Sequence, residues 1–204
     1  KLDAQGQIVG TWSGATYVQG VVSYGKIAGT PAGRVYVMGQ SSLLTFVPGE
    51  SAPTSIYDDN GVYDLALLPS GNLLVLTNYR VVELTPSGEL VREVVPLIGV
   101  VDGRGILYDT ETDTFVTTML GYTNHFHEMR RWDLATGAML DYATYTYADD
   151  IDQFPDGRMI FGSGTEPVAI AHYDLATFTP LNQTQRMFVA IDTIDGVFAD
   201  GFGE

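Results

Sequence analysis

Aspartates recur along this chain at intervals that could bring their carboxylates to one place. Asp59 and Asp64 form a first group, Asp102 stands alone, and Asp150 and Asp152 form a third group. Each group precedes or opens a short run of apolar residues that reads as a strand. Carboxylate oxygens are the ligands that Ca²⁺ prefers. If these strands begin at a shared end of the fold, we expect the five aspartates to offer a Ca²⁺ site.

The same aspartates have a plainer interpretation as solvated loop residues, because Asp also favours turns. Other chemistries have less support. His125 and His127 would face the same side of a strand, but no third metal ligand follows at a recognised spacing, which favours a surface strand pair. The chain has no Cys and no Gly-x-Ser-x-Gly pattern, so the sequence predicts no catalytic residues.

Residues 63–95 show which elements would position these side chains. The stretch reads as four short strands, over residues 63–68, 73–77, 81–84 and 89–95. Pro69-Ser70-Gly71 and Pro86-Ser87-Gly88 predict tight turns, since Pro sets φ for the first corner and Gly accepts positive φ. The first two strands are almost wholly apolar, whereas the last mixes in charge like a strand exposed to water. A four-stranded antiparallel sheet of this kind is a propeller blade.

The same two turns recur along the chain. The inner turn joins the first and second strands of a blade, and the outer turn joins the third and fourth. Gly6, Gly49, Gly88 and Gly137, in the outer turns, are 43, 39 and 49 residues apart, around the period of propeller blades. No segment shows helical periodicity. We therefore predict an all-β fold, a β-propeller of about five four-stranded antiparallel blades. The alternative is a β-sandwich, which the repeated pair of turns makes less favourable.

The predicted blades span about residues 22–57, 63–97, 105–147 and 150–190, with a partial blade from 1–17 and 191–204. The outer strand of this composite blade would contain Gln7, Ile8 and Val9, and its inner strand Val197 and Phe198. Three possibilities stay open. The termini close the ring, the chain is part of a longer propeller, or another copy fills the edge by strand addition. Repeated head to tail, such addition makes a filament.

The composition of the chain indicates which classes of partner it disfavours and where it functions. The chain has 204 residues and a net charge of −15, which argues against nucleic acid and anionic membranes because phosphate needs Lys and Arg. No run of 18 apolar residues is present, so no membrane-spanning helix is predicted. The absence of Cys fits an extracellular bacterial protein, although cytosolic proteins also lack Cys.

The repeat units DLALLPSGNLLVLTNYRVVELTPSGELV and DIDQFPDGRMIFGSG resemble those of NHL-like and SMP-30/gluconolactonase-like propellers. The SMP-30-like family holds a divalent metal through a Glu, an Asn and an Asp, but that triad cannot be placed on this sequence residue by residue. GVFADGFGE also resembles a segment near the C-terminus of secreted gammaproteobacterial proteins, matching at Val197, Phe198, Asp200, Gly201 and Phe202. Gly203 interrupts that pattern and the usual Ser-Gly tail is absent. This second resemblance implies export, with Glu204 near the natural C-terminus.

The sequence thus predicts a secreted, non-enzymatic interaction or structural protein whose partners are proteins, including other copies of itself. The alternative is a metal-dependent hydrolase of the gluconolactonase type, with its site at the acidic channel mouth.

Overall fold

The structure is a computed structural model that describes residues 27–38, 41–47, 49–50, 52–59, 61–97, 100–121, 127–145, 150–153, 158–162, 169–174 and 179–185. Within these residues all regular secondary structure is β-strand, and the strands form four antiparallel four-stranded sheets. Each sheet takes four consecutive strands in chain order. The predicted all-β fold of four-stranded antiparallel blades is therefore confirmed.

Blade 1 consists of β1 Ile27–Gly29, β2 Val35–Met38, β3 Ser42–Phe46 and β4 Thr54–Asp58. Blade 2 consists of β5 Val62–Leu67, β6 Leu73–Thr77, β7 Arg80–Leu84 and β8 Leu90–Pro96. Blade 3 consists of β9 Val100–Asp109, β10 Thr114–Gly121, β11 His127–Asp133 and β12 Met139–Tyr145. Blade 4 consists of β13 Asp150–Gln153, β14 Arg158–Gly162, β15 Ala169–Asp174 and β16 Thr179–Gln185.

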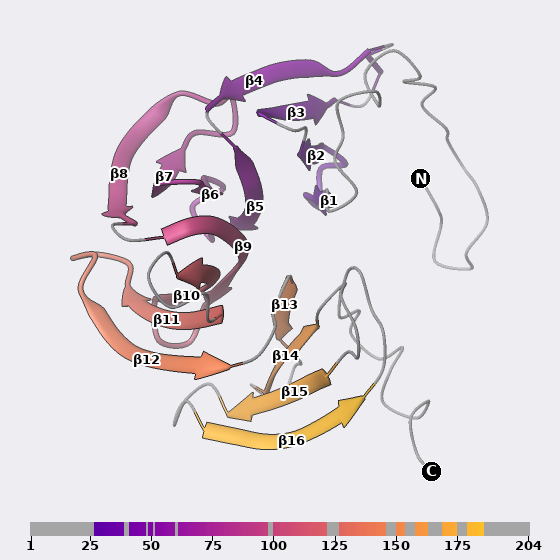
Figure 1. The fold of residues 1–204 in the computed structure, drawn as a ribbon. Helices are drawn as coiled ribbons and strands as arrows, with labels where there is room; N and C mark the ends of the chain where they lie inside the picture. Colours follow the sequence, from indigo (N-terminus) through magenta and orange to yellow (C-terminus); the bar gives the residue numbers. More distant parts are fainter. Residues whose placement is uncertain are drawn as a thin grey trace.

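The blades follow one another round a common centre (Figure 1). The first strand of each blade, β1, β5, β9 or β13, lies toward the centre, and the fourth strand lies outside. Successive inner strands contact each other from β1 to β5, β5 to β9 and β9 to β13. This arrangement puts one face of each blade toward the blade before it and the other toward the blade after it. We call these the preceding face and the following face.

Turn chemistry fixes the corners. In blade 2 the amide of Leu68 donates to the carbonyl of Asn72 at 2.9 Å, and Gly71 adopts a φ of 86° at this inner turn. Blade 3 has one more residue in the same turn, where Asp113 takes a φ of 54°. Its carboxylate accepts a hydrogen bond from the Tyr108 hydroxyl at 2.8 Å. Asp is one of the few non-glycine residues that adopt this conformation readily.

The cores lie between blades, because strand residues alternate between the two faces. Leu73 and Val75 on the preceding face of blade 2 pack with Tyr36, Met38 and Leu43 of blade 1. On the following face, Leu74 and Leu76 pack with residues of blade 3 that include Phe115 and Trp132. Blade 2 is therefore stabilised by apolar contacts with a neighbouring blade on both sides.

One boundary differs from prediction. Blade 3 was expected to begin near residue 105, with Asp102 in the link ahead of it, but β9 already begins at Val100. Asp102 pairs with Leu120 within the sheet, beyond a register shift between Thr118 and Met119. The placement of Asp102 in a link was wrong, because a bulge lengthens the pair of strands. The predicted partial blade, residues 1–17 and 191–204, lies outside the described residues.

Candidate interaction surface

The preceding face of blade 1 is apolar. Ile27 pairs with Val37, which pairs in turn with Leu44, and Val35 pairs with Phe46. Cross-strand partners share one side of a sheet, so these five residues form one surface. The alternating residues Tyr36 and Met38 lie in the core with blade 2. The five residues therefore point away from blade 2.

Blade 2 has the same surface in the same register. Leu65 pairs with Val75, and Val75 pairs with Val82, as Ile27, Val37 and Leu44 do in blade 1. Leu65 is 5% exposed and Val75 is fully buried because blade 1 covers them, whereas Ile27 is 67% exposed. Val35, Val37 and Phe46 are partly exposed and Leu44 is buried. Blade 1 thus presents the apolar residues of an inter-blade core with Ile27 open to solvent.

The outer-turn glycines show the same difference. Gly88 and Gly137 have φ values of 91° and 70°. A Cβ on Gly88 would lie 1.8 Å from the carbonyl oxygen of Ile56 in blade 1, and one on Gly137 would lie 2.5 Å from that of Val94 in blade 2. Gly49 has a φ of 90°, and among the residues that the structure describes no atom lies within 4 Å of the corresponding Cβ position. Each covered outer turn lies against the outer strand of the preceding blade, whereas the outer turn of blade 1 makes no such contact with any part of the chain that the structure describes.

Polar side chains also join blade 1 to blade 2, and blade 2 to blade 3, at the outer turns. Arg34 of blade 1 donates to the carbonyl of Pro86 in blade 2 at 2.8 Å, and the Tyr36 hydroxyl donates to the same oxygen at 3.3 Å. Arg92 of blade 2 donates to the carbonyls of Leu134 and Ala135 in blade 3 at 2.9 and 3.2 Å. At both contacts between blades, the earlier blade supplies the hydrogen-bond donors and the outer turn of the next blade supplies the carbonyl oxygens that accept.

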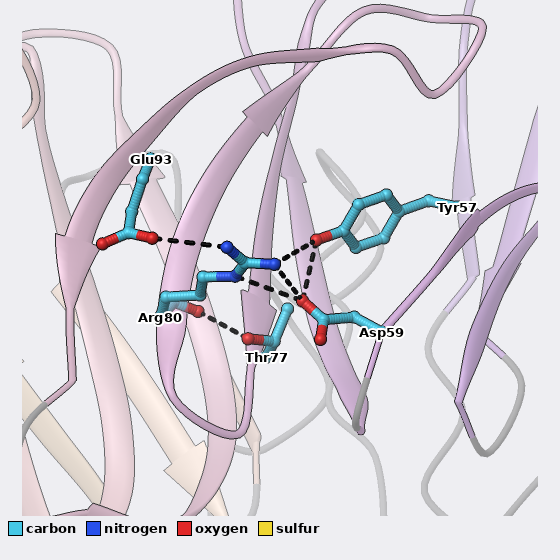
Figure 2. Close-up of polar contacts among 5 residues, drawn as sticks. All are labelled: Tyr57, Asp59, Thr77, Arg80 and Glu93. Atoms are coloured by element: carbon cyan, nitrogen blue, oxygen red, sulfur yellow. Dashed lines mark hydrogen bonds and ion pairs between the residues drawn. The ribbon is translucent and has the colours of Figure 1, made fainter.

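Figure 2 shows a further link between blades 1 and 2, at the end of β4. Asp59 accepts from Arg80 Nε at 3.2 Å, from Arg80 Nη2 at 3.0 Å and from the Tyr57 hydroxyl at 2.8 Å. Arg80 also donates to Glu93 at 3.4 Å. Burial, and then Asp59, raise the pKa of Tyr57 to about 12, and the hydrogen bond to Asp59 raises the pKa of Arg80. This cluster joins the start of β7 to the preceding blade.

Asp64 makes a different link, between inner strands. Its side chain is fully buried. Oδ1 accepts from the amide of Leu65 at 2.6 Å, and Oδ2 accepts from the amide of Ile106 in β9 at 2.7 Å. Hydrogen bonds from backbone N–H groups offset the cost of burying a carboxylate. The predicted ligand Asp64 therefore connects blade 2 to blade 3 near the centre of the molecule.

The other predicted site residues have the following places. Asp102 lies in β9, and Asp150 and Asp152 lie in β13. Among the residues that the structure describes, no three His, Cys, Asp or Glu side chains are grouped so as to hold a metal ion. The Ca²⁺ site stays a prediction. Gln7, Ile8, Val9, Val197 and Phe198, predicted for self-association, lie outside the described residues, as does His125.

His127 is nearly buried at the start of β11. The neighbouring Glu128 accepts from Arg130 at 2.5 Å and from the Tyr142 hydroxyl at 3.3 Å. The Arg130 guanidinium lies 5.9 Å from the ring centre of Trp132, within range of a cation–π interaction. This network satisfies a buried carboxylate and fixes blade 3.

Sequence reasoning did not single out Ile27 or Arg80. Gly49 was noticed as a marker of the repeat, and that repeat carries the signal for Ile27 as well. Ile27 precedes Gly33 by the same six residues that separate Leu65 from Gly71. The spacing assigns Ile27 to an inter-blade position, but it does not say whether a neighbour covers that position.

Comparisons with known proteins agree on the fold. No family model matches the chain, and no curated protein matches it. Among solved structures, the WD40 domain of Neurospora crassa Pan2 is 16% identical with a TM-score of 0.61, covering 83% of this chain and 51% of that chain. Kuenenia stuttgartiensis hydrazine synthase is 14% identical with a TM-score of 0.65, covering 89% and 53%. The WD40 β-propeller domain of Doa1 is 12% identical with a TM-score of 0.62, covering 81% and 55%.

At these identities the likeness shows a β-propeller fold alone. The chain spans about half the length of these three structures. No helix in the described residues is long and apolar enough to cross a membrane.

Proposed function

We propose that this chain is an exported, non-enzymatic β-propeller that acts as an interaction or structural module and associates with further copies of itself through an unfinished blade. The observation that carries the proposal is the 67% exposure of Ile27, at a position where its counterpart Leu65 is 5% exposed. Because a neighbouring blade covers the counterpart position in blade 2, the exposure of Ile27 supports association at this face.

A second copy is the occupant that fits this surface best. Every blade has a preceding face and a following face, and the following face of blade 2 packs on the preceding face of blade 3. A chain whose first blade exposes Ile27 on its preceding face is therefore complementary, at that position, to the last blades of another copy. Such head-to-tail contacts are heterologous, so they extend into a filament unless the rotation closes a ring. Export is supported by the resemblance of GVFADGFGE to segments of secreted proteins.

Light scattering and negative-stain imaging of the full chain test the proposal. We expect species larger than one chain whose size grows with protein concentration. Ile27→Glu places a charge on the preceding face of blade 1 and is expected to shift the population to monomers. Val91→Glu is the matched control, because Val91 is a 49% exposed apolar residue on the outer strand β8. A strictly monomeric wild-type chain, or equal effects of the two variants, would contradict self-association.

The hydrolase alternative differs in its need for a metal. It requires at least three of the predicted carboxylates to converge on one divalent ion. Bound Ca²⁺ would then raise the melting temperature, and EDTA would lower it. We expect no such change, because Asp59 and Asp64 already accept hydrogen bonds from Arg80, Tyr57 and two backbone amides. A clear stabilisation by Ca²⁺ would favour the hydrolase.

A further inference from the structure

The outer strands of blades 2 and 3 expose apolar side chains at matching positions. In each blade two apolar residues stand at the second and third places after the outer-turn glycine, and they begin the outer strand, β8 or β12. About half of each side chain is open to solvent: Leu90 is 55% exposed, Val91 49%, Met139 53% and Leu140 48%. We call these four residues the outer ridge.

Each half of the outer ridge contains the extra residue of a β-bulge. In β8 the residues on either side of Val91 pair with consecutive residues of β7, so Val91 has no partner there. The same holds in β12 for Leu140 opposite β11. A bulge bends an edge strand away from the geometry that pairing with another strand needs. The outer ridge is therefore suited to contact through side chains, and not to addition of a strand.

The fold does not require apolar residues at these places. In blade 1 the second and third residues after Gly49 are Ser51 and Ala52, both small. None of the four ridge side chains belongs to the cores between blades as the structure describes them. The ridge thus leaves apolar surface in solvent without contributing to those cores.

The two halves of the ridge lie on either side of one contact between blades. Arg92 directly follows Val91, and its guanidinium donates to the carbonyls of Leu134 and Ala135 at 2.9 and 3.2 Å. Those carbonyls belong to the outer turn that leads into Met139, and both β8 and β12 lie on the outer rim (Figure 1). Exposed apolar residues that gather in one place mark a contact site, whereas scattered single ones do not.

The charge around the ridge indicates the chemistry of its partner. Glu89 is exposed and directly precedes Leu90, and Asp133 adds a carboxylate at the outer turn before Met139. A second copy brings the same excess of carboxylates, because the chain has a net charge of −15. A segment with Lys or Arg beside its apolar residues complements the ridge instead. The nearby arginines are already paired with carboxylates of their own chain: Arg92 with Glu83, Arg80 with Glu93, and Arg131 with Asp141.

We propose that the outer ridge binds a short segment of a different protein in which apolar residues are flanked by Lys or Arg. The apolar side chains of that segment cover the ridge, and its cations lie near the carboxylates beside it. The ridge is on the outer strands of blades 2 and 3, whereas Ile27 is on the inner strand of blade 1. This binding therefore does not depend on the proposed self-association.

Fluorescence anisotropy of a labelled synthetic peptide, titrated with the full chain, tests the proposal. The peptide has two Leu-Leu pairs flanked by Lys-Lys pairs. We expect saturable binding that weakens as salt is added, because salt screens the charge contacts. One control peptide has Glu in place of each Lys, and the other has Ser in place of each Leu. Both are expected to bind at least about 10-fold more weakly.

Two double variants locate the binding site. Val91→Ser with Leu140→Ser removes one apolar side chain from each half of the ridge and is expected to raise the Kd of the Leu-Lys peptide about 10-fold. Ile27→Ser with Tyr79→Ser is the matched control, because it removes two apolar side chains, 67% and 60% exposed, outside the ridge. It is expected to leave the Kd unchanged. Since all four positions are exposed, both variants should keep the melting temperature of the wild type.

The proposal is overturned if the Leu-Lys peptide does not bind saturably, if the Glu peptide binds as tightly, or if the two double variants weaken binding equally. Light scattering without peptide separates the ridge from self-association. If Val91→Ser with Leu140→Ser makes the assemblies of the pure chain smaller, the occupant of the ridge is a second copy and the proposal is wrong. A monomeric wild-type chain that binds the peptide through the ridge retains this proposal and refutes self-association.

Discussion

The preceding faces of blades 1 and 2 have the same register and the same apolar character, but they differ in what lies against them. Leu65 and Val75 of blade 2 are covered by Tyr36, Met38 and Leu43 of blade 1. Their counterparts in blade 1 are Ile27 and Val37, and Ile27 is 67% exposed. An apolar pattern in a repeat protein therefore specifies a surface for a neighbour, and the neighbour must be identified by other means.

Leu65 and Ile27 are the counterpart apolar residues of the two preceding faces, and truncating them should give the largest difference in the free energy of unfolding. Leu65→Ala is expected to lower the free energy of unfolding by about 2–5 kcal/mol, because it leaves a cavity between blades. Ile27→Ala should cost less than about 1 kcal/mol in dilute protein, where no neighbour covers it. Urea unfolding of both variants at low concentration gives the two values. Equal losses would show that Ile27 is buried in the single chain.

The polar links of blade 2 extend the comparison from apolar to charged groups. Asp64→Ala leaves two buried amides without their acceptor and is expected to cost about 2–4 kcal/mol. Asp59→Ala should cost less than about 1 kcal/mol, since its partner Arg80 has a side chain 36% exposed. The same unfolding measurement applies to both. A larger loss for Asp59 than for Asp64 would mean that the surface cluster, and not the inner-strand link, holds blade 2 in place.

Alanine at the two outer-turn glycines gives a matched pair, because Gly49 and Gly88 have φ values of 90° and 91°. Both substitutions incur backbone strain of about 1–2 kcal/mol. Gly88→Ala also forces its Cβ against Ile56, so we expect it to lower stability by at least about 1 kcal/mol more than Gly49→Ala. The difference between their melting temperatures measures the contact between outer turn and preceding blade. Equal melting temperatures of the two variants would show that the outer turn does not contribute to the contact between blades 1 and 2.

The smallest expected effect is on the pH dependence of stability, through Tyr57 in the polar cluster of Figure 2. Burial and Asp59 raise the pKa of Tyr57 from 10.0 to about 12. The folded state therefore holds the phenol proton more tightly, and this contribution to stability is present below pH 10 and is lost as the pH rises toward 12. Tyr57→Phe should reduce the loss of stability over this range. An unchanged pH dependence would show that the phenol does not contribute to the link between blades.

Local signals in the sequence predict much of this fold. The strands of blade 2 begin and end within one residue of the predicted bounds, because Pro and Gly turns delimit them at both corners. Blade 3 was harder, since its register shifts occur within a long pair of strands and no Pro or Gly turn marks them. The start of β9 and the place of Asp102 depend on pairing with β10, which spacing alone does not reveal.

The site was less predictable than the fold. An aspartate ahead of a strand indicates that a carboxylate needs donors, but it does not say which. For Asp64 the donor includes the amide of Ile106, which is 42 residues away in the chain. For Asp59 it is Arg80, on another blade. These partners are defined by how blades pack together, which a repeat pattern predicts only in outline.

Self-association of this chain requires another copy to cover the preceding face of blade 1. The chain has no cysteine, so Ile27→Cys introduces a single thiol at the centre of that face, and its reaction rate with a thiol reagent reports coverage directly. We expect fast reaction in dilute protein and slow reaction in concentrated protein. A rate that is the same at all concentrations, whether fast or slow, would contradict self-association, because the face would then be always open or always covered by its own chain.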